Sequence, residues 1–187
     1  MTNLVYTAYP EADLREIADT LNGRRGSKDD VLHRFGLPDE GSRRHLKVPQ
    51  LWRVLQAVFT GADTPDNDKL IAAIDGVEYL DGWSDMGAAY IGAADTADIA
   101  RVLAQVDFDS RWQVFAQSLK QSAEGVSESD LAAFDEAFRL QGSEEFEACD
   151  APERVAEMRD WFGKLCAFYR DAAAEGCGVI VSFAAHV

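Results

Sequence analysis

The side chains that could act as nucleophiles, general bases or soft metal ligands are few and far apart in this sequence of 187 residues. They are three histidines and three cysteines: His33, His45, His186, Cys149, Cys166 and Cys177. No histidines stand in an HxH or HxxxH spacing and no cysteines form a CxxC pair, so neither a zinc site nor a disulfide framework is indicated. A catalytic imidazole also needs an orienting partner and a group to activate. The sequence therefore predicts no catalytic residue and no metal.

Three further segments resemble ligand loops only in composition. Asp63, Asp66 and Asp68 lack the central glycine and terminal glutamate of an EF-hand calcium loop, which favours a solvated acidic turn. Residues 23–28 lack the Gly-Lys-Ser/Thr end of a P-loop. Residues 176–178 are glycine-rich but precede a strand-like segment, whereas a dinucleotide loop precedes a helix. We therefore expect no cofactor.

Side chains suited to binding are easier to find, because tryptophan, tyrosine and arginine dominate binding hot spots. The candidates are Trp52, Arg53, Gln56, Trp83, Tyr90 and Arg170. Two or three of the four tryptophans are expected in the core. An exposed one beside charged groups would be an anchor for a partner.

A helix predicted over residues 49–60 would position the first three candidates. Its apolar residues recur at i, i+3, i+4 and i+7 and form a core-facing stripe: Leu51, Val54, Leu55, Val58 and Phe59. Pro49 fits the first helical position. Trp52 stands about one position off this stripe, so we expect it at the rim of the helix face.

The other elements follow from apolar periodicity and from stop signals. Helices are predicted over residues 11–21, 28–35, 69–75, 127–142 and 152–175. Two further helices are predicted by their starts, one at a capping box formed by residues 95–98 and one at residue 109 or 110. Strand-like segments cover 4–9, 76–80, 88–91 and 179–183, whereas 37–48 is expected as a loop and 143–150 as an acidic linker. Because several helices separate successive strands, an alternating βαβ fold is disfavoured. We expect one domain over residues 1–187, a helix-rich α+β fold with a small mixed or antiparallel sheet.

Charge restricts the classes of partner. The formal net charge is −15 and the pI is near 4.5, so the surface repels nucleic acid and anionic membranes and favours cationic proteins. The basic cluster at Arg43, Arg44, His45 and Lys47 is expected to pair with surrounding carboxylates rather than to bind nucleic acid. The start of the chain lacks the basic and apolar regions of a signal peptide, and no apolar run is long enough to span a bilayer. We expect a cytoplasmic protein with free thiols.

Three motifs, in this order and spacing, resemble the YfbM-like family of small bacterial domains. They are the helix ending in Phe59-Thr60-Gly61, the segment from Ala89-Tyr90-Ile91 to Asp98-Ile99-Ala100, and the helix containing Phe168-Tyr169-Arg170. The resemblance implies a single α+β domain in the bacterial cytoplasm with no established activity, and it favours an immunity-type role. Members often carry histidine where this chain has Arg53 or Gln56, so any family chemistry at that histidine is missing here.

Two functions remain as hypotheses. The first is a non-catalytic, immunity-like binding protein that recognises a basic protein partner through its acidic surface. The second is a small-molecule-binding or enzymatic domain with a pocket between the Trp52 helix and the sheet, lined by Gln56, Tyr90 and Arg170. A purely structural subunit is a third reading. The sequence leaves open the oligomeric state, the identity of the partner and the role of the cysteines.

Overall fold

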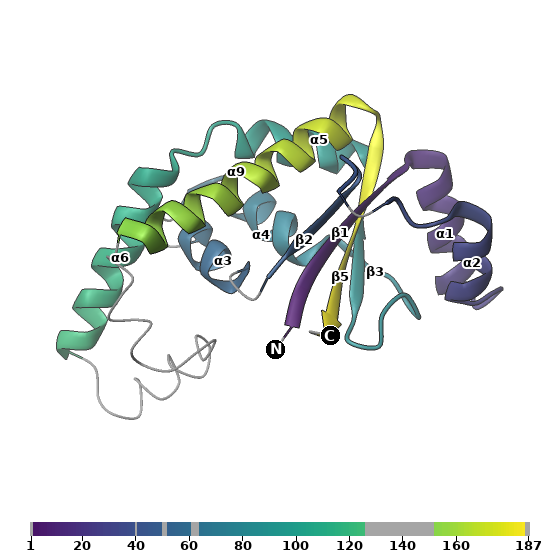
Figure 1. Cartoon of the computed structure of the whole chain (residues 1–187), viewed down its shortest axis with the longest axis horizontal. Helices are drawn as coiled ribbons and strands as arrows, with labels where there is room; N and C mark the ends of the chain where they lie inside the picture. The colour runs from purple at the N-terminus through teal and green to yellow at the C-terminus, as the bar shows by residue number, and fades with distance from the viewer. Residues whose placement is uncertain (1, 40, 50–51, 61–63, 126–151, 186–187) are drawn as a thin grey trace.

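The computed structural model describes residues 2–39, 41–49, 52–60, 64–125 and 152–185, which build an antiparallel five-stranded sheet (Figure 1). The strand order is β2-β1-β5-β4-β3. The bounds are β1 Thr2–Pro10, β2 His45–Val48, β3 Glu78–Tyr79, β4 Ala88–Ile91 and β5 Cys177–Ala185. With the helices between them, they confirm the expected helix-rich α+β fold.

The two ends of the chain form the centre of the sheet. β1 pairs with β5 over its whole length, from Thr2 opposite Ala185 to Pro10 opposite Cys177. The predicted strands at both ends and at 88–91 are therefore confirmed. The loop predicted over residues 37–48 is partly wrong, because its last four residues form β2 on the edge beside β1. Leu46 and Val48 alternate there with polar His45 and Lys47, a two-residue period too short to stand out among charges and turn residues.

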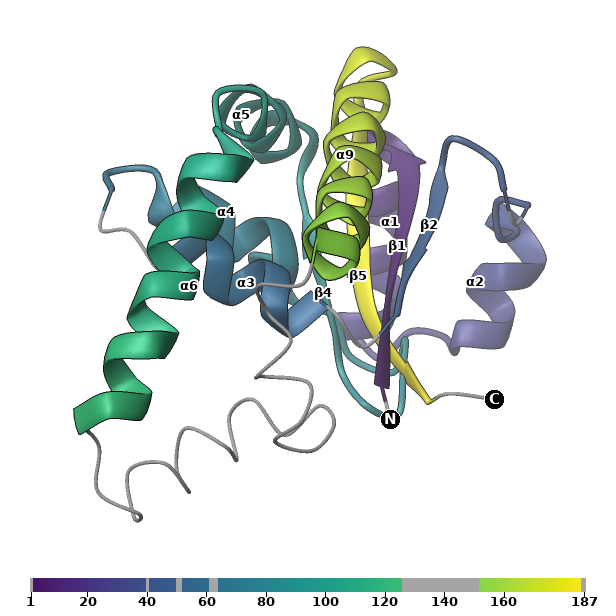
Figure 2. The same cartoon turned by 60° about the vertical axis from the view of Figure 1, so that its left-hand side comes forward.

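Helices cover both faces of the sheet (Figure 2). On one face lie α3 (Trp52–Thr60), α4 (Asn67–Asp75), α5 (Ala93–Leu103), α6 (Phe108–Gly125) and α9 (Pro152–Ala174). Their apolar side chains join those of Leu4, Tyr6 and Val181 in the larger core cluster. On the other face, α1 (Glu11–Asn22) and α2 (Lys28–Phe35) cover a smaller cluster that includes Tyr9 and Ile180.

Two helix starts show how well capping can be predicted from sequence. Ser27 caps α2 and forms a reciprocal capping box with Asp30, as its position predicts. The box predicted at residues 95–98 is wrong, because α5 begins at Ala93 and Thr96 lies buried inside it. The backbone N–H of Ala93 donates instead to the Glu11 carboxylate of α1 at 2.7 Å, a cap from a distant segment that local sequence cannot reveal.

Gly178 lets α1 approach the centre of the sheet. A Cβ atom there would lie 2.2 Å from Cδ2 of Leu14 and 2.6 Å from the carbonyl oxygen of Ile91. Only glycine therefore fits at this point of β5 without displacing α1 or β4.

The helix predicted over residues 127–142 and the linker over 143–150 lie outside the described residues, as do Cys149 and Asp63. None of the described helices has both the length and the apolar character that a bilayer-crossing helix requires.

Candidate functional site

Trp52 belongs to the core rather than to the rim of a binding face. It is 8% exposed, and its ring packs against that of Phe183 in β5 with centroids 5.4 Å apart. The predicted rim position is wrong because Trp52, Leu55 and Phe59 are themselves spaced i, i+3 and i+7, and so share the buried side of α3. The side chain of Arg53 lies outside the described residues.

Gln56 joins α3 to the end of α4. Its side-chain amide donates to the Asp75 carboxylate at 2.8 Å. Burial raises the pKa of Asp75, and the hydrogen bond from Gln56 opposes that rise. Asp75 is also the last residue of α4, where the helix dipole disfavours a negative charge.

Trp83 and Tyr90 lie on the opposite face of the sheet from α3. Tyr90 stands directly across from Ile180, and both side chains pack with the smaller core cluster beneath α1 and α2. Trp83 is buried in the same cluster, edge-to-face with Tyr9 at 6.1 Å. Neither tryptophan predicted to bind is therefore accessible to a partner.

Arg170 is exposed on α9 and its Nε donates to the carboxylate of its neighbour Asp171 at 2.9 Å. Gln56 and Tyr90 are separated by the sheet. The pocket predicted beside the Trp52 helix, with Gln56, Tyr90 and Arg170 as its polar lining, is therefore not assembled, because strand alternation points Tyr90 away from α3.

The two described cysteines are free thiols. Burial raises the pKa of Cys166 to about 11 and also raises the pKa of Cys177. Because the thiolate is the reactive form, neither is activated as a nucleophile. Among the described residues, no group of three His, Cys, Asp or Glu side chains is placed to hold a metal ion.

The strongest surface feature is the β3–β4 hairpin and the chain that flanks it. Between Lys69 and Arg101 the sequence contains no lysine or arginine but six acidic residues: Asp75, Glu78, Asp81, Asp85, Asp95 and Asp98. Lys69 forms ion pairs with the last two. The first four have no ion pair with a cation in the described part of the chain, and Lys28 contacts the hairpin at the Trp83 ring, 5.4 Å from its centroid.

Large apolar side chains are exposed on the same hairpin. Val77 is 51% exposed, Tyr79 65% and Met86 50%. We refer to Val77, Glu78, Tyr79, Asp81, Asp85 and Met86 together as the hairpin surface. Sequence reasoning missed the apolar half of this surface. The absence of lysine and arginine between Lys69 and Arg101 was a sequence signal for the acidic half of this surface.

Glu78 is held in place by Tyr90, whose hydroxyl donates to its carboxylate at 2.5 Å. This hydrogen bond is the main cause that raises the pKa of Tyr90 to about 12, followed by burial and by the charges of Glu78, Asp19 and Glu11. The negative potential at this end of the sheet therefore comes from α1 as well as from the hairpin.

Asn22, the last residue of α1, is hydrogen-bonded to the outer edge of β3. Its side-chain amide donates to the carbonyl oxygen of Tyr79 at 3.0 Å, and its side-chain oxygen accepts from the N–H of Asp81 at 2.8 Å. One carboxamide thus pairs with two backbone groups on the edge of the sheet.

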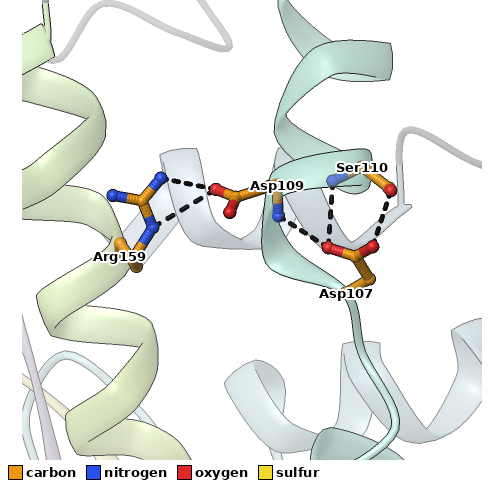
Figure 3. Close-up of polar contacts among 4 residues, drawn as sticks. All are labelled: Asp107, Asp109, Ser110 and Arg159. Carbon is orange, nitrogen blue, oxygen red and sulfur yellow. Dashed lines mark hydrogen bonds and ion pairs between the residues drawn. The ribbon is translucent and has the colours of Figure 1, made fainter.

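A second surface feature is a cleft of about 220 Å³ between α5, α6 and the start of α4. Asp107, Ser110 and Arg111 line its polar side. The Asp107 carboxylate accepts hydrogen bonds from the backbone N–H groups of Asp109 and Ser110 and from the Ser110 hydroxyl, which lower its pKa (Figure 3). Asp107 is therefore the N-cap of α6, which begins at Phe108, one or two residues before the predicted start at 109 or 110.

Arg111, which lines the cleft, and Arg159, which lies outside it, are both engaged with neighbouring helices. Arg159 of α9 donates to Asp109 through Nε at 3.2 Å and through Nη2 at 2.5 Å (Figure 3). The Arg111 guanidinium binds the Phe59 carbonyl oxygen and the Thr64 hydroxyl, and so fixes α6 against the end of α3. The polar groups of the cleft thus hold helix ends together. Its volume is also below the roughly 300–1,000 Å³ of ordinary ligand pockets.

Comparison with known proteins agrees with this architecture. The crystal structure of YfbM from Escherichia coli, a protein of unknown function, is similar with a TM-score of 0.61 and 19% sequence identity, covering 98% of this chain and 100% of that one. At this identity the likeness establishes the fold alone. No curated protein sequence gave a significant match. The family model described as a domain of unknown function, DUF1877, matches residues 6–182, and the chain therefore belongs to this family.

Proposed function

We propose that this chain is a non-catalytic, immunity-like binding protein of the cytoplasm that recognises a basic protein partner through the hairpin surface. The observation that carries the proposal is the stretch between Lys69 and Arg101, which contains six acidic residues and no cation. Asp81 and Asp85 form no ion pair among the described residues, although Lys28 lies 5.4 Å from the ring of neighbouring Trp83, so a cationic partner would not first have to break an ion pair there.

The apolar side chains of the hairpin surface add affinity to this electrostatic attraction. Exposed tyrosine and methionine are residue types that interfaces favour, and both lie on the same hairpin. Charge would then govern the association rate and its salt dependence, and Tyr79 would contribute the desolvated contact. The free thiols, with pKa values raised by burial, and the engaged groups of the cleft favour no catalytic alternative.

Two charge-reversal variants test this proposal with equal changes in net charge. Asp81→Lys/Asp85→Lys changes the hairpin surface, whereas Asp29→Lys/Asp39→Lys changes exposed acids near α2; each variant raises the charge from −15 by 4, to −11. The partner is first captured from the source cells at low salt and identified by mass spectrometry. It is then purified and titrated against the three forms of the chain.

We expect the hairpin variant to bind at least tenfold more weakly than the unmodified chain, and the control variant to bind within about threefold of it. Affinity should fall steeply as salt rises. Equal losses in the two variants, or a partner without basic character, would contradict the proposal. Circular dichroism confirms beforehand that both variants are folded.

A further inference from the structure

The outer edge of β3 has the geometry of a strand-pairing site. We propose that an extended, basic segment of the partner adds to the sheet at the outward-facing backbone groups of Tyr79 and Asp81 and displaces the Asn22 side chain. The inference deepens the proposed function and rests on it, because it specifies how a basic partner would be held.

Backbone geometry shows which groups are available. The N–H of Leu80 donates inward to the carbonyl oxygen of Ala88 at 2.9 Å. Since consecutive residues of a strand direct their backbone groups to opposite sides, those of Tyr79 and Asp81 face outward. The carboxamide of Asn22 bonds the Tyr79 carbonyl and the Asp81 N–H, the groups that a neighbouring strand would bond. Asn22 thus occupies the place of a peptide group on a missing strand.

Lysine and proline, which often protect a sheet edge, are absent from this one, and its protection is instead the shortness of β3, two residues long. Natural edge strands are blunted by lysine, proline or a covering element. The opposite edge of this sheet, β2, carries the exposed Lys47. Residues 77–81 contain no lysine or proline, and Val77 and Tyr79 are exposed. The Asn22 carboxamide is bonded to this edge, so a ligand strand would have to displace it.

The acidic side chains along this edge favour a basic strand over a second copy of the chain. Glu78 points to the face covered by α1, where it accepts from Tyr90, and Tyr79 points to the other face. An added strand would therefore place basic side chains beside Glu78 and apolar ones beside Tyr79, in alternation. A second copy of this chain would instead bring Glu78 and Asp81 against acids of its own kind, which like-charge repulsion disfavours.

The test uses the full chain and a synthetic probe, the acetylated and amidated octapeptide (Arg-Val)₄. A second peptide has the same sequence with every backbone amide N-methylated, so that charge and side chains remain but the strand donors are lost. Affinities are measured by isothermal titration calorimetry for the unmodified chain, for Asn22→Ala and for Gln105→Ala. The last variant is a control that removes an exposed carboxamide away from β3.

We expect the unmethylated peptide to bind at least tenfold more tightly than the methylated one. Asn22→Ala should bind the unmethylated peptide about fivefold more tightly than the unmodified chain, because two hydrogen bonds no longer have to be displaced. Gln105→Ala should leave the affinity unchanged.

Three results would overturn the inference. Equal binding of both peptides, with no effect of Asn22→Ala, would mean charge attraction without strand pairing and would leave the proposed function intact. Binding of neither peptide would reject the edge as a site, while the partner titration decides the proposed function separately. Dimerisation of Asn22→Ala in sedimentation experiments would assign the edge to a second copy of the chain.

Discussion

Replacing Tyr6 by phenylalanine should stabilise the fold, whereas the same replacement at Tyr169 should destabilise it. Both side chains are fully buried, with ring centroids 6.1 Å apart. The Tyr6 hydroxyl has no hydrogen-bond partner among the described residues. The Tyr169 hydroxyl donates to the carbonyl oxygen of Ala73 at 2.8 Å. The same chemical change, loss of one buried oxygen, therefore has opposite consequences at two adjacent rings.

The magnitudes follow from these partners. A buried hydroxyl without a partner costs about 1–3 kcal/mol of desolvation, which Tyr6→Phe would recover in part. Ala73 contributes one of the last four carbonyl groups of α4, which lack donors within the helix. Tyr169→Phe would remove that donor and leave the buried carbonyl unpaired, at a cost of about 1–3 kcal/mol.

Urea denaturation followed by circular dichroism measures the free energy of unfolding of each variant. Thermal denaturation followed by the same signal measures its Tm. For a domain of this size, 1 kcal/mol corresponds to about 2–4 °C in Tm. We expect Tm to rise by a few degrees in Tyr6→Phe and to fall by a similar amount in Tyr169→Phe. Destabilisation by both substitutions would refute the reasoning, since it would mean that the Tyr6 hydroxyl is hydrogen-bonded, for instance to buried water.

Other substitutions test further features of the fold. Gly178→Ala should destabilise the chain by about 1–3 kcal/mol in urea, because its methyl group would overlap Leu14. Asp75→Asn should stabilise it by about 0.5 kcal/mol at neutral pH, since it removes a carboxylate from a helix C-terminus. Burial raises the pKa of Asp75 in the folded state, so this gain should be complete above that pKa and vanish as pH falls below the ordinary value of 3.8. Cys166, with a pKa of about 11, should react with Ellman's reagent at pH 8 far more slowly than an exposed cysteine, and rapid labelling without unfolding would contradict its burial.

Much of the fold could be predicted from the sequence because its signals are local. Ser27 caps its helix, Pro152 opens the helix over residues 152–174, and the β-prone segments at both ends form strands. Each of these signals acts within one turn of helix or one stretch of alternating residues.

The parts that could not be predicted depend on distant segments. The cap of α5 is Glu11, more than eighty positions away in the chain. β2 is too short to show its alternation, and the burial of Trp52 depends on Phe183 at the far end of the sequence.

The candidate site was predicted less well than the fold. The sequence indicated an acidic protein with a basic partner, but it directed attention to tryptophans that lie in the core. Exposed Tyr79 could not be distinguished from a buried strand residue, because burial on an edge strand depends on which helices cover it. The pairing of Asn22 with the edge likewise joins segments that are distant in sequence.

The most direct test of the central claim is hydrogen–deuterium exchange of the chain alone and in complex with its purified basic partner. We expect complex formation to slow exchange within residues 77–90 and to leave exchange in α2 and α9 unchanged. Protection confined to other elements, with residues 77–90 exchanging as in the free chain, would contradict the central claim.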